Sequence, residues 1–114
     1  FNGSTTIHNN SAGDVGGAIS INDTCGVFWD GNMTLSEDTA ASNGGAVSAA
    51  HDSNLTSQGS TLFQRNSASA SGGAIYSRRG SRVYIDGMMI FANNHATSGG
   101  AIRIESNSTL SLDG

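Results

Sequence analysis

The sequence predicts an all-β protein, a right-handed parallel β-helix of about four three-sided turns. Two observations predict this fold. A set of residue patterns recurs about every 28 residues, and each period holds three short runs in which apolar and polar residues alternate. A fixed period of this length is typical of solenoids, and the alternation is typical of half-buried strands. The right-handed sense follows from the usual geometry of parallel crossovers.

Two markers define the period. The first is an apolar residue with Asn or Asp three positions later and Ala two positions after that; its copies begin at Ile7, Leu35, Phe63 and Phe91, always 28 residues apart. The second is Gly-Gly-Ala followed by Ile or Val, with copies spaced by 28, 28 and 27 residues. Because both markers keep one register, we expect a single β-helix segment over residues 1–114. The expected repeats are approximately 1–28, 29–56, 57–84 and 85–111, and residues 112–114 begin a fifth.

Each period contains three pairs of mostly apolar residues spaced by two, so both members of a pair point to the same side of a strand. We assign these pairs to the interior, in columns that repeat from turn to turn. The columns include Ile7, Leu35, Phe63 and Phe91 on the first face, Ile19, Val47, Ile75 and Ile102 on the second, and Val27, Leu55, Val83 and Leu110 on the third. The residues between the paired positions, among them Phe28, Tyr76 and Tyr84, are expected to point outward.

Glycine pairs mark the corners of the expected coil. A Gly-Gly pair fits a corner where φ is positive, or where the neighbouring turn leaves no room for a Cβ atom. The corner glycines are Gly16, Gly17, Gly44, Gly45, Gly72, Gly73, Gly99 and Gly100. The chain contains no Pro, as expected where strands are flanked on both sides and each N–H is needed for the ladder.

A column of short polar residues follows the first strand of each period. It consists of Asn10, Asp38, Asn66 and Asn94. Side chains of this type bond turn backbone and stack on their copies in adjacent turns. We therefore interpret the column as a structural turn ladder. A metal site at this position would need several converging carboxylates, and only Asp38 carries a charge.

The pairing of these markers resembles the repeat of the chlamydial polymorphic outer-membrane proteins. The resemblance is clearest where Phe-x-x-Asn at 63–66 and 91–94 precedes Gly-Gly-Ala-Ile at 72–75 and 99–102. The earlier copies differ, with Ile7 and Leu35 in place of Phe, Asp38 in place of Asn and Val47 in place of Ile. The resemblance implies a secreted or surface-exposed parallel β-helix, often adhesive. The motif residues are architectural, so they identify the fold better than the function.

Composition and charge argue against several classes of function. The net charge is −4, which disfavours a nucleic-acid partner because phosphate binding needs a basic surface. The longest apolar run, residues 88–92, is far shorter than a membrane span. Lys is absent, and the nine carboxylates and three histidines are scattered over the period. We therefore expect no enzymatic activity, no catalytic or metal site and no cofactor.

The distribution of charge indicates how turns associate. Residues 1–57 hold six carboxylates and no Arg, whereas residues 58–114 hold all five Arg and three carboxylates. The last residues also return to the register of the first. Both features favour axial head-to-tail stacking, either on copies of the chain or on adjoining β-helical coils. The first hypothesis is therefore a glycosylated, extracellular structural segment of a fibre or surface filament. The alternative is a surface adhesin, similar to an autotransporter passenger, that binds a host protein or glycan.

Two further groups of residues are candidate sites. Six Asn-x-Ser/Thr sequons are candidates for N-glycosylation if the source is eukaryotic, and are otherwise turn residues. They are Asn2, Asn9, Asn22, Asn32, Asn54 and Asn107. Exposed aromatics and a short basic cluster form a possible surface for sugar stacking or protein contact. This surface comprises Phe28, Tyr76, Tyr84, Arg78, Arg79 and Arg82.

Overall fold

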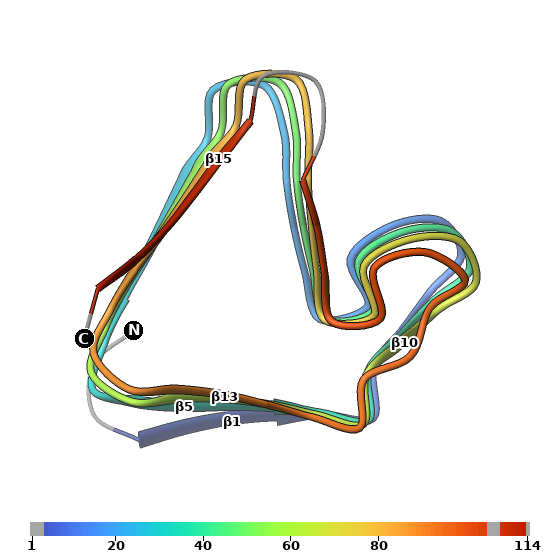
Figure 1. Cartoon of the computed structure of the whole chain (residues 1–114), viewed down its shortest axis with the longest axis horizontal. Coiled ribbons are helices and arrows are strands. Elements are labelled where there is room, and N and C mark those ends of the chain that lie inside the picture. The colour runs from blue at the N-terminus through green and yellow to red at the C-terminus, as the bar shows by residue number, and fades with distance from the viewer. Residues whose placement is uncertain (1–3, 105–107, 114) are drawn as a thin grey trace.

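The structure is a β-solenoid of about four turns in which every sheet is parallel. It is a computed structural model that describes residues 4–104 and 108–113. Three sheets of four strands form the long sides of the coil, and Figure 1 shows them as a triangle with one lobed corner. The chain runs counter-clockwise as it rises toward the viewer in Figure 1, which is the right-handed sense. The predicted fold class is confirmed.

The strands repeat in a fixed order along the chain. Sheet A contains β1 (Ser4–His8), β5 (Asn32–Ser36), β9 (Thr61–Gln64) and β13 (Met89–Ala92). Sheet C contains β3 (Ile19–Ile21), β7 (Val47–Ala49), β11 (Ile75–Ser77) and β14 (Ile102–Ile104). Sheet D contains β4 (Gly26–Asp30), β8 (Asn54–Gln58), β12 (Arg82–Asp86) and β15 (Thr109–Asp113).

A fourth sheet, which the sequence analysis did not predict, lies in the lobe. Sheet B contains β2 (Ser11–Ala12), β6 (Thr39–Ala40) and β10 (Ser67–Ala68). Strands of two residues are too short to show an alternating pattern. The three long sides of each turn were therefore predicted, and the short additional strand between sheets A and C was missed.

The register of the sheets places each predicted column on its copies. Ile7 pairs with Leu35, and Leu35 pairs with Phe63. In the middle turns these side chains are fully buried, with Leu35 and Phe63 at 0% exposure. The rings of Phe63 and Phe91 stack in parallel with centroids 5.0 Å apart. The predicted interior columns are confirmed, except at Leu110, whose side chain lies outside the described part of the chain.

One cluster of polar groups lies within this apolar core. The indole Nε1 of Trp29 donates a hydrogen bond to Thr61 Oγ1 at 3.2 Å, and Ser57 Oγ lies 2.8 Å from the same oxygen. All three residues are buried. Burying polar groups costs little when they bond one another, so this cluster fits the core and joins sheet D to sheet A.

The outer face of sheet C is covered in its middle turns, although Ser20 and Arg103 at its two ends are exposed, and this corrects the prediction for Tyr76. Its side chain lies on that outer face as expected, but it is only 3% exposed, as is Ser48 one turn earlier. The lobe lies beside this face in Figure 1. A Cβ on Gly72 would lie 3.2 Å from the Cα of Tyr76, so the corner also packs closely against the strand. Tyr76 is therefore not part of an exposed contact surface.

The two glycines of each pair serve different purposes. The first glycine of every pair has a positive φ, between 61° and 67°. The second does not, but a Cβ on Gly45 would collide with the carbonyl oxygen of Gly73 in the next turn. Both reasons that the sequence suggested for Gly-Gly corners are thus present, one at each position.

Gly45→Ala should therefore lower the free energy of unfolding by about 3 kcal/mol, because the turns must separate to admit the methyl group. Gly13→Ala is the matched control: a Cβ at Gly13 meets no atom within 4 Å, and its effect should stay within about 0.5 kcal/mol. Urea denaturation of both variants measures the difference. Equal effects at the two positions would contradict the close approach of the turns.

Candidate functional site

The outer face of sheet D carries the exposed aromatic residues. Phe28, Thr56 and Tyr84 pair in register on successive strands of this sheet. Phe28 is 50% exposed and Tyr84 is 37% exposed. Since neighbouring strands lie about 4.8 Å apart, the two rings are about 10 Å apart with Thr56 between them. Arg82, two residues before Tyr84, is exposed on the same face.

The structure separates the six residues of the predicted contact surface. Phe28, Tyr84 and Arg82 share the face of sheet D, whereas Tyr76 is buried on sheet C. The guanidinium of Arg78 lies 5.9 Å from the ring centre of Tyr76, a cation–π distance. Arg79 Nη1 donates to His51 Nε2 at 3.1 Å, across adjacent turns. The arginines of the basic cluster therefore contact different neighbours, with Arg78 beside Tyr76 and Arg79 beside His51.

Four sequon asparagines lie on the surface. Asn9, Asn22, Asn32 and Asn54 are all exposed, and the other two candidates, Asn2 and Asn107, lie outside the described residues. Asn9 Nδ2 donates to His8 Nδ1, and Asn22 Oδ1 accepts the backbone N–H of Asp23. Asn54 is on the outer face of sheet D, beside Thr56. A glycan at Asn54 would therefore lie next to the aromatic column.

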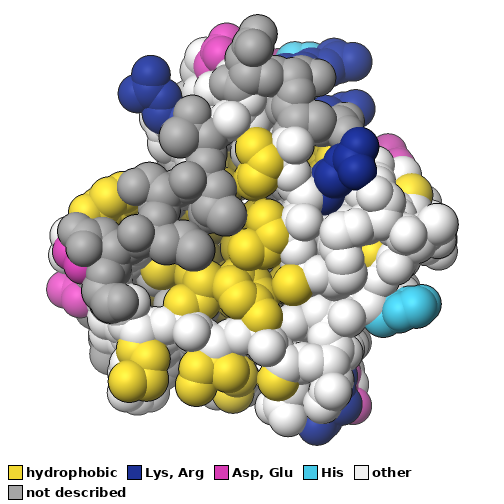
Figure 2. All heavy atoms as spheres, viewed as in Figure 1, with side chains coloured by type: hydrophobic (Ala, Val, Ile, Leu, Met, Phe, Trp, Pro, Cys, Tyr) yellow, Lys and Arg dark blue, Asp and Glu magenta, His cyan; other side chains and the backbone are white. Residues whose placement is uncertain are grey.

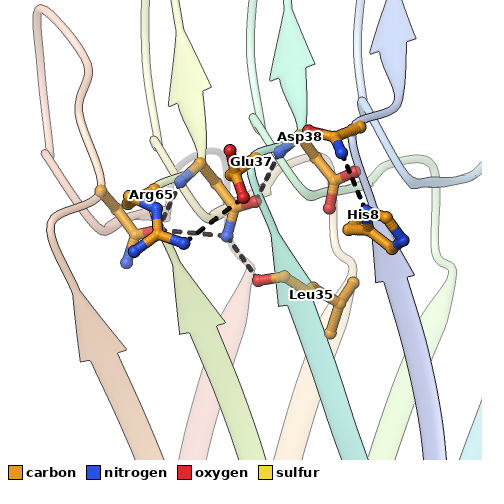
Figure 3. Close-up of polar contacts among 8 residues, drawn as sticks. His8, Leu35, Glu37, Asp38 and Arg65 are labelled. Atoms are coloured by element: carbon orange, nitrogen blue, oxygen red, sulfur yellow. Dashed lines mark hydrogen bonds and ion pairs between the residues drawn. The ribbon is translucent and has the colours of Figure 1, made fainter.

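The predicted turn ladder is present as a chain of hydrogen bonds from turn to turn, and Figure 3 draws the part of it that begins at Asp38. The backbone N–H groups of Asn10, Asp38 and Asn66 donate to the Oδ1 atom of the next member, each at 3.0 Å. The amide of Asn66 also donates to Asn94 Oδ1 at 3.1 Å and to the carbonyl of Leu35 at 3.0 Å. The ladder therefore ties each turn to both neighbours.

Asp38 differs chemically from the other members of the ladder. It is 0% exposed, its Oδ1 accepts from both the backbone and the amide of Asn10, and its Oδ2 has no hydrogen-bond partner in the described part of the chain. Burial raises the pKa of this carboxyl above its ordinary value of 3.8, while the hydrogen bonds from Asn10 and the nearby His8 lower it by a smaller amount. Its neighbour Glu37 points to solvent and pairs with Arg65 at 3.3 Å.

The described part of the chain shows no site of a familiar enzymatic type. Among residues 4–104 and 108–113, no group of three or more His, Cys, Asp or Glu side chains is arranged to hold a metal ion. The surface formed by these residues has no pocket. They also form no helix, and so none that is long and apolar enough to cross a membrane.

An exposed apolar pair, which the sequence did not single out as a surface, lies on the outer face of β13 and just before this strand. Met88 is 63% exposed and Ile90 is 49% exposed. Their signal was present in residues 88–92, an apolar run in which the outward positions are apolar as well as the inward ones.

Comparison with known families agrees with this geometry. The repeat of the Chlamydia polymorphic membrane proteins matches residues 4–22, 60–78 and 89–109, just over half of the chain. The chain belongs to this repeat family. The matched segments of the polymorphic membrane protein repeat include three of the four Gly-Gly corners and omit the turn that contains Asp38. No curated protein and no solved structure matches the chain.

Truncating a ladder side chain to Ala should lower the free energy of unfolding by an amount that depends on its burial. Asn66→Ala leaves the N–H of Asp38 and the carbonyl of Leu35 buried without these partners, which should cost about 3 kcal/mol of unfolding free energy. Asn94→Ala removes equivalent bonds in a half-exposed turn, where water replaces them, and should cost about 1 kcal/mol. Chemical denaturation compares the two. A larger loss at position 94 than at position 66 would contradict the conclusion that burial determines the cost of removing a ladder side chain.

Proposed function

We propose that this chain is a non-enzymatic structural segment of an extracellular or cell-surface filament, in which β-helical turns stack end to end. The observation that carries the proposal is the apolar core, which is closed in the middle turns and open at both ends. Membership of a membrane protein repeat family supports a surface location. A solenoid whose described surface has no pocket also fits a structural role better than a catalytic one.

The two ends of the described solenoid expose complementary groups. On one side, β1, β3 and β4 have no strand on their outer edge, and the core residues Ile7, Ile19 and Val27 are only half-buried. On the other side, β13 and β14 are unpaired in the same way, and Phe91 and Ile102 are half-buried. Figure 2 looks along the axis onto this second end and shows hydrophobic side chains gathered within the ring of turns. Open edges and apolar surface of this kind favour the addition of another turn.

Charge favours a head-to-tail orientation of the added turn. Glu37 and Arg65 already pair across adjacent turns. The acidic first half of one copy and the basic second half of another would meet in a head-to-tail stack. Exposed pairs of this type select orientation more than they increase affinity, so the apolar core supplies the main driving force.

Gly100→Ala should prevent stacking without harming the fold. Among the described residues, a Cβ on Gly100 meets only one atom within 4 Å, the carbonyl oxygen of Asn94 at 3.6 Å. In a stack, Gly17 of the next copy would lie above Gly100 as Gly100 lies above Gly73. The methyl group of Ala at position 100 would then collide with the carbonyl oxygen of that Gly17. We expect the wild-type chain to form axial oligomers in sedimentation and electron microscopy. The variant should remain monomeric with an unchanged melting temperature.

The control for stacking is Gly13→Ala, which should assemble like the wild type. Assembly of Gly100→Ala to the wild-type extent would contradict the in-register contact. A wild-type chain that stays monomeric at every concentration would overturn the filament proposal itself.

A second candidate function is an adhesin that binds a glycan on the face of sheet D. The observation that favours it is the pair of exposed rings, Phe28 and Tyr84, in one column about 10 Å apart. Aromatic faces stack on sugar rings, and polar residues beside them, here Asn54 and Arg82, can bond hydroxyl groups. This function and glycosylation of Asn54 compete for the same face.

Two measurements, binding to a glycan array and the intact mass of native protein, test whether the face of sheet D binds a glycan or carries one at Asn54. If sheet D is an adhesive face, Phe28→Ala with Tyr84→Ala should reduce binding at least tenfold, and Met88→Ala with Ile90→Ala should not. Hexose mass at Asn54 would instead support the glycosylated structural segment. No binding by an unmodified protein would exclude the glycan-binding face.

A further inference from the structure

Asp38 occupies a position in the ladder where the adjacent turns use an amide as a donor. Asn66 Nδ2 donates to the carbonyl of Leu35, and Asn94 Nδ2 donates to the carbonyl of Phe63, in each case 31 residues earlier. Because Ile7 pairs with Leu35 in register, the carbonyl of Ile7 is the equivalent partner for Asp38. The second atom of the Asp38 side chain is an oxygen, which cannot donate unless it carries a proton.

Both potential partners of Asp38 Oδ2 are acceptors. The first is the carbonyl of Ile7. The second is Asn66 Oδ1, which corresponds to the Asn94 Oδ1 that accepts from the Asn66 amide. Asp38 Oδ2 is buried and has no partner among the described residues. An ionised carboxylate would therefore place a buried negative charge against oxygen atoms, an arrangement that proteins avoid.

The charged groups on the packed turns compensate for this charge only in part, through the nearby His8. Glu37, beside Asp38, directs its side chain outward and pairs with Arg65 of the following turn. His8 of the preceding turn is exposed and accepts from Asn9. Figure 3 shows the carboxyl of Asp38 with no interaction drawn to His8, Glu37 or Arg65. Thus none of these three side chains donates to Oδ2.

We propose that Asp38 carries a proton in the folded protein at pH values where an exposed Asp is ionised, and that this neutral acid replaces an asparagine amide in the ladder. The added hydrogen lets Oδ2 donate to one of its two acceptor neighbours, as the amides of Asn66 and Asn94 do. Ionisation removes this donor and places a charge between the first and third turns. The stability of the second turn of the solenoid therefore depends on whether Asp38 is protonated.

The sign of the pH dependence follows from the raised pKa of Asp38. A group with a raised pKa in the folded state stabilises the fold fully below its unfolded pKa, and that stability is lost as pH rises through the folded pKa. Stability should therefore fall between the ordinary value of 3.8 and the higher folded value. A protonated His8 opposes the effect only in part, since burial is the larger influence.

Direct titration tests the proposal. In ¹³C NMR of the wild-type chain, the Asp38 carboxyl should titrate at a higher pH than every other assigned Asp. Asp38→Asn should fold, because Asn fills this position in the other turns. Its melting temperature should match the wild type below pH 3.8 and exceed it at neutral pH by about 5 °C.

Two variants separate this contact from general electrostatic effects. Glu37→Gln, at the neighbouring residue, removes a charge without touching the ladder and should keep the wild-type pH profile. Asn66→Asp places a second acid in a fully buried ladder position and should steepen the loss of stability with pH. An Asp38 that titrates at or below the ordinary Asp value would overturn the proposal. A constant melting difference between Asp38→Asn and the wild type at all pH values would also overturn it.

Discussion

The structure depends on hydrogen bonds between turns that keep the chain in register with itself. Strand residues bond backbone groups in the adjacent turns; for example, Met33 N–H donates to Ser60, and Thr61 N–H donates to Met88. Each side chain therefore lies above its copy from the previous turn. Because the turns are about 4.8 Å apart, a residue at a corner affects two neighbours at once. This constraint explains why small residues and short amides recur at fixed positions.

The columns differ in how strictly they determine residue type. The first interior column accepts Ile7, Leu35, Phe63 and Phe91, since apolar residues of different volume can repack along the axis. The second corner glycine accepts no Cβ where another turn lies above it. The ladder position accepts Asp38 in place of Asn, but at the cost of an oxygen without a donor. Substitution in the core changes how side chains pack, whereas substitution in the ladder changes which atoms donate and accept hydrogen bonds.

Function is left to the surfaces that the repeat does not constrain. The outer face of sheet D varies from Phe28 to Thr56 to Tyr84 although the backbone beneath is constant. The outer face of sheet A changes from Thr34 to Leu62 to Ile90 along the axis. At the two ends of the described solenoid, the outer edges of the first and last strands of each long sheet are unpaired. In this β-helix, the residues of the inward columns and corners therefore determine the fold, and the residues of the outer faces and ends are the ones that can contact other molecules.

The sequence by itself determined the period, the three long strands of each turn, the interior columns, the ladder and the corners. These features repeat, and each copy shows the same local alternation or the same small residues. Only the tertiary structure decided that the lobe carries a fourth short sheet, that Tyr76 and Ser48 are covered, and that Asp38 Oδ2 lacks a donor. The lobe follows no alternating pattern, and its short strands are defined by their pairing with the adjacent turns. The state of Asp38 depends on atoms 28 and 31 residues away, which come together only when the turns stack.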